Sequence, residues 1–363
     1  MITRIKPQPG VMDIELYVSG KGHIKGQSNT VKLSSNENPW GASKDARRAY
    51  QSLAGELHVY PSSDHVALRT AISEVHNVDA ERVICSNGSD ELISLLCQAY
   101  AGAGDEVLFT EHGFLMYKLC AQGVGATPVA VSEMERCTDV DAVLAVANEN
   151  TKLVFIANPN NPTGTMVPEQ DVVRLVDGLP NHTLLVLDGA YAEYVDGFDG
   201  HASLVDDRDN VFITRTFSKI YGLGGLRLGW GYGPAEIVNT LHRLRGPFNV
   251  NASVLAAGEA AVLDTDYTTK CRKTNAKWSK FLRKKLLGMG IACDASQANF
   301  VLARFGSEAE ADAADQVLSD AGLLVRAVKS YGLAECLRIT VGKGADCKRV
   351  VSVLQEFKDG WIA

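Results

Sequence analysis

The chain has 363 residues, of which 46% are hydrophobic and 22% are charged, and its formal net charge at pH 7 is -7. This length exceeds what one small core needs, and the composition is that of a folded globular protein. The acidic balance argues against a nucleic-acid partner, for which a basic face is expected, and no apolar run is long enough to span a bilayer.

The N-terminal stretch has no apolar core followed by a small-residue cleavage site, so secretion is not expected. The eight cysteines show no CxxC spacing, and the eight histidines form no HExxH pattern. We therefore expect a cytoplasmic protein with free thiols, without a disulfide framework and without a metal site.

The first part of the chain is irregular. Prolines and glycines interrupt residues 1–29, which we expect to form an N-terminal arm. The stretch Leu33–Ser43, LSSNENPWGAS, is by itself typical of a surface turn. After Tyr60-Pro61, apolar residues at helical spacing predict the first clear helix; they are Leu68, Ile72 and Val75.

From Val83 onward, short apolar runs alternate with helical patterns. After the run that begins at Val83, strands are predicted at Glu106–Thr110, Pro128–Val131, Leu153–Ala157, Leu184–Asp188, Val211–Phe217 and Leu228–Tyr232. Strands separated by helices favour an α/β fold with a mostly parallel sheet covered on both faces. We predict a seven-stranded sheet between helices, in a large domain over residues 30–247.

After Pro247 the pattern changes. A long helical stretch is predicted from about Ser253 to Leu287. Short strands then follow near Ala298–Phe305 and Cys336–Val341, and helices near Glu308–Ala321 and Asp346–Lys358. This pattern predicts a smaller α+β domain over residues 248–363.

The segment around Lys219 carries the main chemical signal. An apolar strand delivers this lysine among apolar residues and glycines, whereas a surface lysine usually has polar neighbours. A desolvated lysine loses its proton more easily and can form a Schiff base with an aldehyde. The hydroxyls of Thr216 and Ser218, together with Arg227, are suited to a phosphate. An aldehyde that carries a phosphate is pyridoxal 5'-phosphate (PLP), although a buried glycine-rich turn with a chance lysine is the plainer interpretation.

Two turns that follow strands add polar groups. The turn Asn87–Asp90 precedes a helix, and a helix start offers free backbone N–H groups to an anion, but most strand–helix units share this feature. The turn Ala157–Thr165, ANPNNPTGT, contains Asn161, whose amide could meet a polar group on a cofactor ring. Each turn is also explained as a simple loop.

Charged side chains occupy two predicted buried strands. Asp188 ends one strand, where a carboxylate is costly unless it is paired, and a pyridinium N–H is such a partner. That pairing keeps the ring protonated, and Tyr191 follows at a distance suited to the ring phenolate oxygen. Arg338 lies within another strand, where a substrate carboxylate or phosphate suits its planar fork; a structural salt bridge is the alternative.

These motifs together resemble a known family. In chain order, SNENPWG, YP, NGSDE, NPNNPTG, DGAY, SKIYGLGGLRLG and LRITVG resemble the class I/II aminotransferases of PLP fold type I, over nearly the whole chain. Within the family, the chain looks like the members that act on histidinol phosphate. The further signals are Tyr17-Val-Ser-Gly, RGPFNVN, SQANFVLARF and the Arg326/Arg338 pair.

The resemblance implies a role for each matching position in cofactor binding and catalysis. Lys219 would bond to the cofactor and move the proton, and Asp188 would pair with the pyridine nitrogen. Asn161 and Tyr191 would bind the ring oxygen, and Phe114 would stack on the ring. The cofactor phosphate would be held by Ser89, Asp90, Thr216, Ser218 and Arg227. Tyr60 would reach the phosphate in the other subunit, which implies a homodimer with shared active sites.

The resemblance also implies substrate contacts. Arg338 would bind the α-carboxylate of the amino donor glutamate, and Asn38 would lie in a loop beside the substrate. Arg326, with Tyr17 from the partner subunit, would hold the phosphate of the histidine precursor. The 2-oxo acceptor would be 2-oxoglutarate.

Two positions depart from the family pattern. The residue after the pyridine-binding aspartate is Gly189, where a glutamate is more usual, and His112 stands in place of a proline before the stacking aromatic. These departures leave open a related enzyme on the same scaffold. The alternatives are an aromatic amino-acid aminotransferase, a phosphothreonine decarboxylase and, more remotely, a non-catalytic binding domain.

Overall fold

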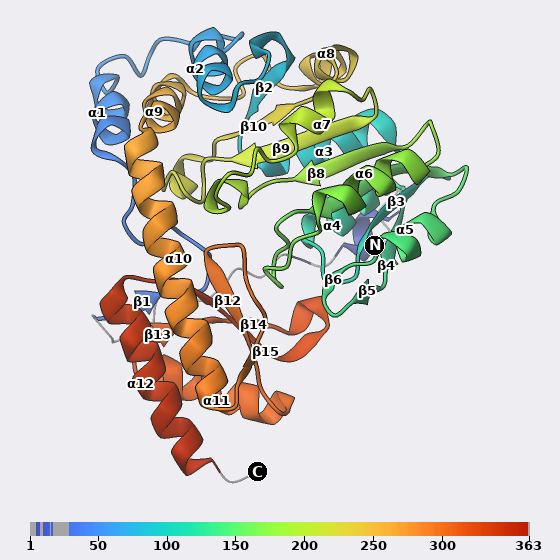
Figure 1. Ribbon diagram of the computed structural model, residues 1–363. Coiled ribbons are helices and arrows are strands. Elements are labelled where there is room, and N and C mark those ends of the chain that lie inside the picture. The colour runs from blue at the N-terminus through green and yellow to red at the C-terminus, as the bar shows by residue number, and fades with distance from the viewer. Residues whose placement is uncertain (1–4, 8–9, 15, 17–28, 362–363) are drawn as a thin grey trace.

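The structure, a computed structural model, describes residues 5–7, 10–14, 16 and 29–361 (Figure 1). A helix-covered sheet forms the larger part of the molecule, and a smaller sheet with helices lies beside it. In the part of the chain described, no helix is both long enough and apolar enough to cross a membrane. All eight cysteines fall within this part and are free thiols.

A seven-stranded sheet forms the larger part, in the order β2-β10-β9-β8-β7-β3-β4. Its strands are β2 (Val83–Ser86), β3 (Glu106–Thr110), β4 (Thr127–Val131), β7 (Thr151–Ala157), β8 (Leu184–Asp188), β9 (Val211–Thr216) and β10 (Gly229–Tyr232). Within this sheet β10 runs antiparallel to both neighbours, and the other pairs are parallel. The predicted mostly parallel seven-stranded sheet is confirmed, with small shifts at the strand ends.

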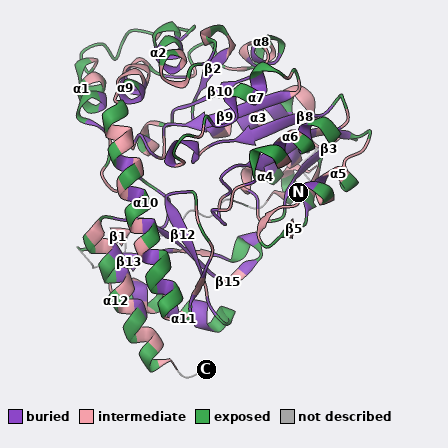
Figure 2. Cartoon of the chain, viewed as in Figure 1, coloured by how far each residue is buried: buried purple, intermediate pink, exposed green. Residues whose placement is uncertain are grey.

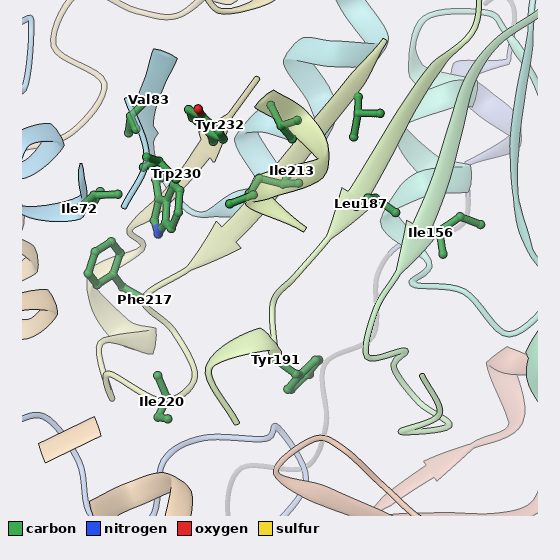
Figure 3. Close-up of a cluster of buried hydrophobic side chains, with 14 of the residues drawn as sticks. Ile72, Val83, Ile156, Leu187, Tyr191, Ile213, Phe217, Ile220, Trp230 and Tyr232 are labelled. Atoms are coloured by element: carbon green, nitrogen blue, oxygen red, sulfur yellow. The ribbon is translucent and has the colours of Figure 1, made fainter. Parts of the chain in front are cut away.

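The sheet is buried on both faces because its strands are apolar at successive positions. On β7, Val154 and Ile156 belong to one hydrophobic core, whereas Leu153 and Phe155 belong to the other. This alternation follows from the two-residue repeat of a strand. Figure 3 shows the first core across the sheet, from Val83 and Trp230 to Leu187 and Ile156.

Helices cover each face and leave their polar sides in solvent (Figure 2). The first core includes residues of α1 (Lys44–Ser52), α2 (Val66–His76), α5 (Val140–Val146), α6 (Glu169–Gly178), α7 (Ala202–Asp206) and α9 (Ala252–Leu263). The second core includes residues of α3 (Ser89–Tyr100), α4 (Met116–Gly123) and α8 (Ala235–Leu244).

The smaller part contains an antiparallel sheet in the order β11-β12-β15-β14. Its strands are β11 (Ala292–Cys293), β12 (Phe300–Arg304), β14 (Arg326–Val328) and β15 (Leu333–Thr340), and its helices are α10 (Thr265–Gly288), α11 (Glu308–Asp320) and α12 (Gly344–Gly360). These elements share a third hydrophobic core. The predicted smaller α+β unit is therefore present.

The helical stretch predicted from about Ser253 to Leu287 is present, but it is divided into two helices. Helix α9 ends at Leu263, and Asp264 caps the start of α10 by accepting a hydrogen bond from the backbone N–H of Tyr267. An aspartate at this position satisfies a helix-start donor, which favours a new helix over continuation.

The chain crosses between the two parts near both predicted domain boundaries. Strand β1 (Val31–Lys32) pairs with β13 (Leu323–Leu324) of the smaller part, and Leu33 lies in the third core. Helix α9 packs instead against α1 and α2 of the larger part. The boundaries at residues 30 and 248 stay predictions.

Candidate active site

A cavity of about 510 Å³ lies where the carboxyl ends of the central strands meet the smaller sheet. Ala157, Asp188 and Thr216 reach it from the ends of β7, β8 and β9, which is where parallel sheets usually bind ligands. Twelve predicted site residues line it: Ser89, Asp90, Phe114, Asn161, Asp188, Tyr191, Thr216, Ser218, Lys219, Arg227, Arg326 and Arg338.

Lys219 follows β9 and is held in place by its apolar neighbours. Phe217 and Ile220 are fully buried, and the backbone N–H of Phe217 donates to the carbonyl of Leu228 at 2.9 Å. The Nζ of Lys219 donates to the carbonyl of Ser35 at 3.3 Å. Burial lowers the pKa of Lys219 to about 8, and the positive charge of Arg338 acts in the same direction. The neutral amine, which can attack an aldehyde, is therefore far more abundant near neutral pH than in an ordinary lysine.

Asp188 ends β8 and is 4% exposed. Its Oδ2 accepts a hydrogen bond from the phenol of Tyr117 at 2.8 Å, and its Oδ1 accepts one from the backbone N–H of Ala190 at 3.1 Å. Burial raises the pKa of Asp188, against the effect of these donors. A cationic N–H in the cavity would stabilise the ionised carboxylate.

Tyr191 lies beyond the end of β8, with its ring edge against Phe300. Its phenol oxygen accepts a hydrogen bond from the side-chain amide of Asn36 at 2.9 Å. Burial raises the pKa of Tyr191, so the phenol stays protonated and can donate to an acceptor in the cavity.

Arg227 and the start of α3 form an anion-binding corner. One Nη of Arg227 donates to Asp90 Oδ2 and the other to Ser218 Oγ, both at 3.1 Å. A Cβ added at Gly88 would lie 2.5 Å from the guanidinium, so the approach requires glycine there. Hydroxyls, a guanidinium and a helix start are suited to a phosphate group.

Two arginines come from neighbouring strands of the smaller sheet. Arg338 on β15 is 7% exposed and donates to the carbonyl of Ser34 at 2.7 Å and to Asn161 Oδ1. Arg326 on β14 is the direct cross-strand partner of Arg338. The carbonyl oxygen of Asn161 is thus engaged, which leaves the amide N–H₂ as its donor toward the cavity.

The residues present fit PLP. The lysine amine, the buried carboxylate and the anion-binding corner surround one cavity, and they match the aldehyde, the ring nitrogen and the phosphate of this cofactor. The two arginines are suited to a further anion.

Three predicted site residues are not among those that line this cavity. Tyr60 is 79% exposed and stacks on Phe248 with ring centroids 4.8 Å apart. The amide of Asn38 donates to the carbonyl of Ile220 at 2.6 Å, so it supports the lysine segment from behind. Tyr17 lies outside the described residues.

Several residues that line the cavity were not predicted from the sequence. Asn36, rather than Asn38, is the asparagine of its loop that lines the cavity. Its φ of 56° is a left-handed conformation, which asparagine tolerates better than most residues. Ser34, Ser35, Met116 and Tyr331 also line the cavity, and Tyr117 supports Asp188 from outside it. No sequence signal marked these residues except their closeness to the quoted motifs.

The two departures from the family pattern have local explanations. A Cβ at Gly189 would lie 2.8 Å from Cδ of Arg215, whose guanidinium is buried against Glu193. The ring Nδ1 of His112 lies 2.9 Å from Glu133 Oε2. Burial lowers the pKa of His112, but the hydrogen bond and charge of Glu133 outweigh it and raise the pKa overall.

Comparisons with known proteins identify the family of the chain. The family model for aminotransferase class I and II matches residues 28–354. Histidinol-phosphate aminotransferases from Ruegeria sp. (strain TM1040) and Ruegeria pomeroyi are 58% and 55% identical, each over 99% of this chain and 99% of its own length. A crystal structure of histidinol-phosphate aminotransferase from Sinorhizobium meliloti, in complex with pyridoxal-5'-phosphate, superposes with a TM-score of 0.90 at 27% identity; the match covers 99% of this chain and 98% of that one. The chain belongs to the class I and II aminotransferases.

Proposed function

We propose that the chain is a PLP-dependent aminotransferase of histidine biosynthesis. It transfers the amino group of L-histidinol phosphate to 2-oxoglutarate, which gives imidazole-acetol phosphate and L-glutamate, and it catalyses the reverse reaction. The observation that carries the proposal is the Arg326–Arg338 pair in the cavity that also holds Lys219. The names of the full-length relatives at 55–58% identity support the same substrate.

When bound, PLP supplies an aldehyde for the amino group and a protonated ring that draws electrons from the substrate α-carbon. Asp188 keeps the ring nitrogen protonated, and Tyr191 donates to the ring oxygen. The amine of Lys219 would take the proton from the substrate α-carbon and return it to the aldehyde carbon of the cofactor, on the other side of the transferred nitrogen. Its lowered pKa suits this general-base role.

The two substrates place different demands on one pocket. Glutamate presents an α-carboxylate, whereas L-histidinol phosphate carries a phosphorylated CH2OH group in place of that carboxylate. Arg338 binds the carboxylate, and Arg326 holds the phosphate. Two guanidiniums from adjacent strands meet both demands better than one.

The active enzyme is proposed to be a cytoplasmic homodimer with shared sites. Tyr60 and Phe248 form an exposed aromatic pair, and Leu57 and Val59 beside Tyr60 in sequence are 82% and 54% exposed. Exposed apolar residues grouped in this way are typical of an interface. In the dimer, Tyr60 contributes to the phosphate site of the other subunit. Free thiols throughout are consistent with a reducing compartment.

The competing candidate is an aromatic amino-acid aminotransferase, because Phe114, Met116 and Tyr331 give the cavity an apolar wall. The test compares kcat/KM for L-histidinol phosphate and L-phenylalanine with 2-oxoglutarate as acceptor, and measures carbon dioxide release from phosphothreonine. We expect kcat/KM for L-histidinol phosphate to exceed that for L-phenylalanine by at least about 100-fold, because L-phenylalanine has no phosphate and loses the charged contact with the arginine pair. A preference for phenylalanine, or release of carbon dioxide, would overturn the substrate assignment.

A further inference from the structure

Tyr117 connects two groups that hold the cofactor ring, although it is not among the residues that line the cavity. It lies in the first turn of α4, is fully buried, and stacks on Phe155 with centroids 4.8 Å apart and planes 7° from parallel. The rings of Tyr117 and Phe114 are nearly perpendicular, with centroids 5.9 Å apart. The phenol of Tyr117 donates to Asp188 Oδ2 at 2.8 Å. One side chain thus contacts both the predicted ring-stacking residue and the ring-nitrogen partner.

We propose that Tyr117 is a positioning residue that holds Asp188 ionised and correctly oriented for the cofactor nitrogen. The inference deepens the proposed function and rests on its assignment of PLP to this cavity. Tyr117 donates to Oδ2 and the Ala190 N–H donates to Oδ1, and a side-chain hydrogen bond from Thr214 also lowers the pKa of Asp188. The ionised carboxylate has further lone pairs with which it can accept from the pyridinium.

The chemistry of the hydrogen bond explains why a tyrosine suits this position. Burial raises the pKa of Tyr117 well above its ordinary range, so the phenol remains a neutral donor. Burial also raises the pKa of Asp188, and the negative charge of Asp90 on α3 acts in the same direction. A donor that binds the ionised carboxylate opposes both effects. Tyr191 and Lys219 line the same cavity as Asp188. Burial raises the pKa of Tyr191, so its phenol stays protonated, and burial lowers the pKa of Lys219 to about 8.

The stacking on Phe155 makes the position of the phenol rigid. Parallel rings at this distance restrict rotation of the side chain, and Phe155 is itself fully buried in β7. The phenol oxygen is therefore directed at the end of β8 before the cofactor binds. Loss of the hydroxyl alone would leave this packing in place.

The test replaces Tyr117 by phenylalanine, which removes the hydroxyl and keeps the ring. PLP affinity is measured as a function of pH for both proteins, because the pKa of Asp188 is raised by burial. Without the donor Tyr117, the pKa of Asp188 rises further. As the pH is lowered, the affinity for PLP should therefore begin to fall at a higher pH in Tyr117→Phe than in the wild type. The value of kcat should fall about 10-fold or more while KM for the amino donor changes little, because the lost hydrogen bond is to a charged group.

Tyr232→Phe is the matched control. It removes a phenol that donates to Asp206 at a distance from the cavity, so its PLP titration and kcat should equal those of the wild type. In an Asp188→Asn background, Tyr117→Phe should have little further effect on kcat. Comparison of the single and double variants therefore measures the energetic coupling between Tyr117 and Asp188.

The outcomes separate the two proposals. If wild-type protein fails to bind PLP, the proposed function is wrong. If the wild type binds PLP but Tyr117→Phe shows the wild-type pH profile and kcat, only the role of Tyr117 is wrong. If Tyr117→Phe lowered kcat by the same factor in the wild type and in the Asp188→Asn background, Tyr117 would act only through packing.

Discussion

Arg326 and Arg338 stand directly opposite each other on the antiparallel strands β14 and β15. Like charges at opposed positions destabilise a sheet, and both residues line the cavity that contains Lys219. The arrangement is explained if an anion of the substrate lies between or beside the two guanidiniums. The proposed substrate choice depends on this pair.

Arg326→Gln should raise KM for L-histidinol phosphate about 10- to 100-fold, because a charge-assisted contact is worth about 1.5–3 kcal/mol. KM for glutamate should change less, since Arg338 remains. Steady-state kinetics with each amino donor measure the difference. Arg349→Gln, at an exposed arginine on α12, is the control and should change neither value. Equal effects of Arg326→Gln on both donors would contradict the division of roles.

Asp188→Ala should retain some PLP binding but lower kcat by about 100- to 1000-fold, because a preorganised electrostatic partner of this kind contributes about 3–4 kcal/mol. Equilibrium dialysis and a coupled glutamate assay measure the two properties. A variant with near-normal kcat would show that Asp188 does not protonate the ring.

Lys219→Met should stabilise the cofactor-free protein at neutral pH. The pKa of Lys219 is about 8 in the folded state, below its usual value, so folding disfavours the protonated amine. This destabilisation is fully present below about pH 8 and disappears as pH rises toward about 10.5, where the unfolded lysine also loses its proton. Removing the lysine should therefore raise the free energy of unfolding by on the order of 1 kcal/mol at pH 7, after allowance for the partial solvent exposure of the side chain.

Denaturant unfolding at several pH values measures this difference in the free energy of unfolding. The gain should shrink between about pH 8 and about pH 10. A gain that is constant with pH would assign the effect to packing rather than to the buried charge.

Gly189→Ala should destabilise the protein by about 1–3 kcal/mol, the usual cost of overpacking. The added Cβ would lie 2.8 Å from Cδ of Arg215, inside the buried Arg215–Glu193 pair. Gly55→Ala is the control, since a Cβ there meets nothing within 4 Å. Thermal unfolding of both variants gives the comparison, and an unchanged Tm for Gly189→Ala would show that Arg215 moves away freely.

A hybrid dimer tests whether Tyr60 acts across the interface. Lys219→Ala is expected to be inactive and Tyr60→Ala to be weakened. A hybrid of the two would contain one site in which both residues are intact. Mixing the variants after reversible dissociation should give activity well above either parent. If Tyr60 served its own subunit, the hybrid would show no such recovery.

Most of the fold followed from local patterns. Continuous apolar runs within β7 (Leu153–Ala157), β8 (Leu184–Leu187) and β9 (Val211–Ile213) are a strong signal for a buried parallel sheet. The break between α9 and α10 was missed because Asp264 interrupts an otherwise helical pattern without a proline or glycine. The pairing of β1 with β13 joins residues almost the full chain apart, and no local pattern indicates it.

The site was predictable where a motif carries the chemistry, as for Lys219, Asp188 and Arg227. It was not predictable where tertiary packing selects the residue. Asn36 and Asn38 are equivalent in the sequence SNEN, and only the left-handed backbone of Asn36 aims its amide at Tyr191. Tyr117 on α4 reaches Asp188 at the end of β8 only through the tertiary fold, because the two residues are far apart in the chain.

The most direct measurement mixes the PLP-loaded protein with L-histidinol phosphate alone and follows the cofactor absorbance. We expect complete conversion to the pyridoxamine form at low substrate concentration, without any 2-oxo acid. Lys219→Ala should give no conversion. A wild-type protein that responds to glutamate and phenylalanine but not to L-histidinol phosphate would contradict the proposed substrate, and no response to any amine would contradict the role of Lys219.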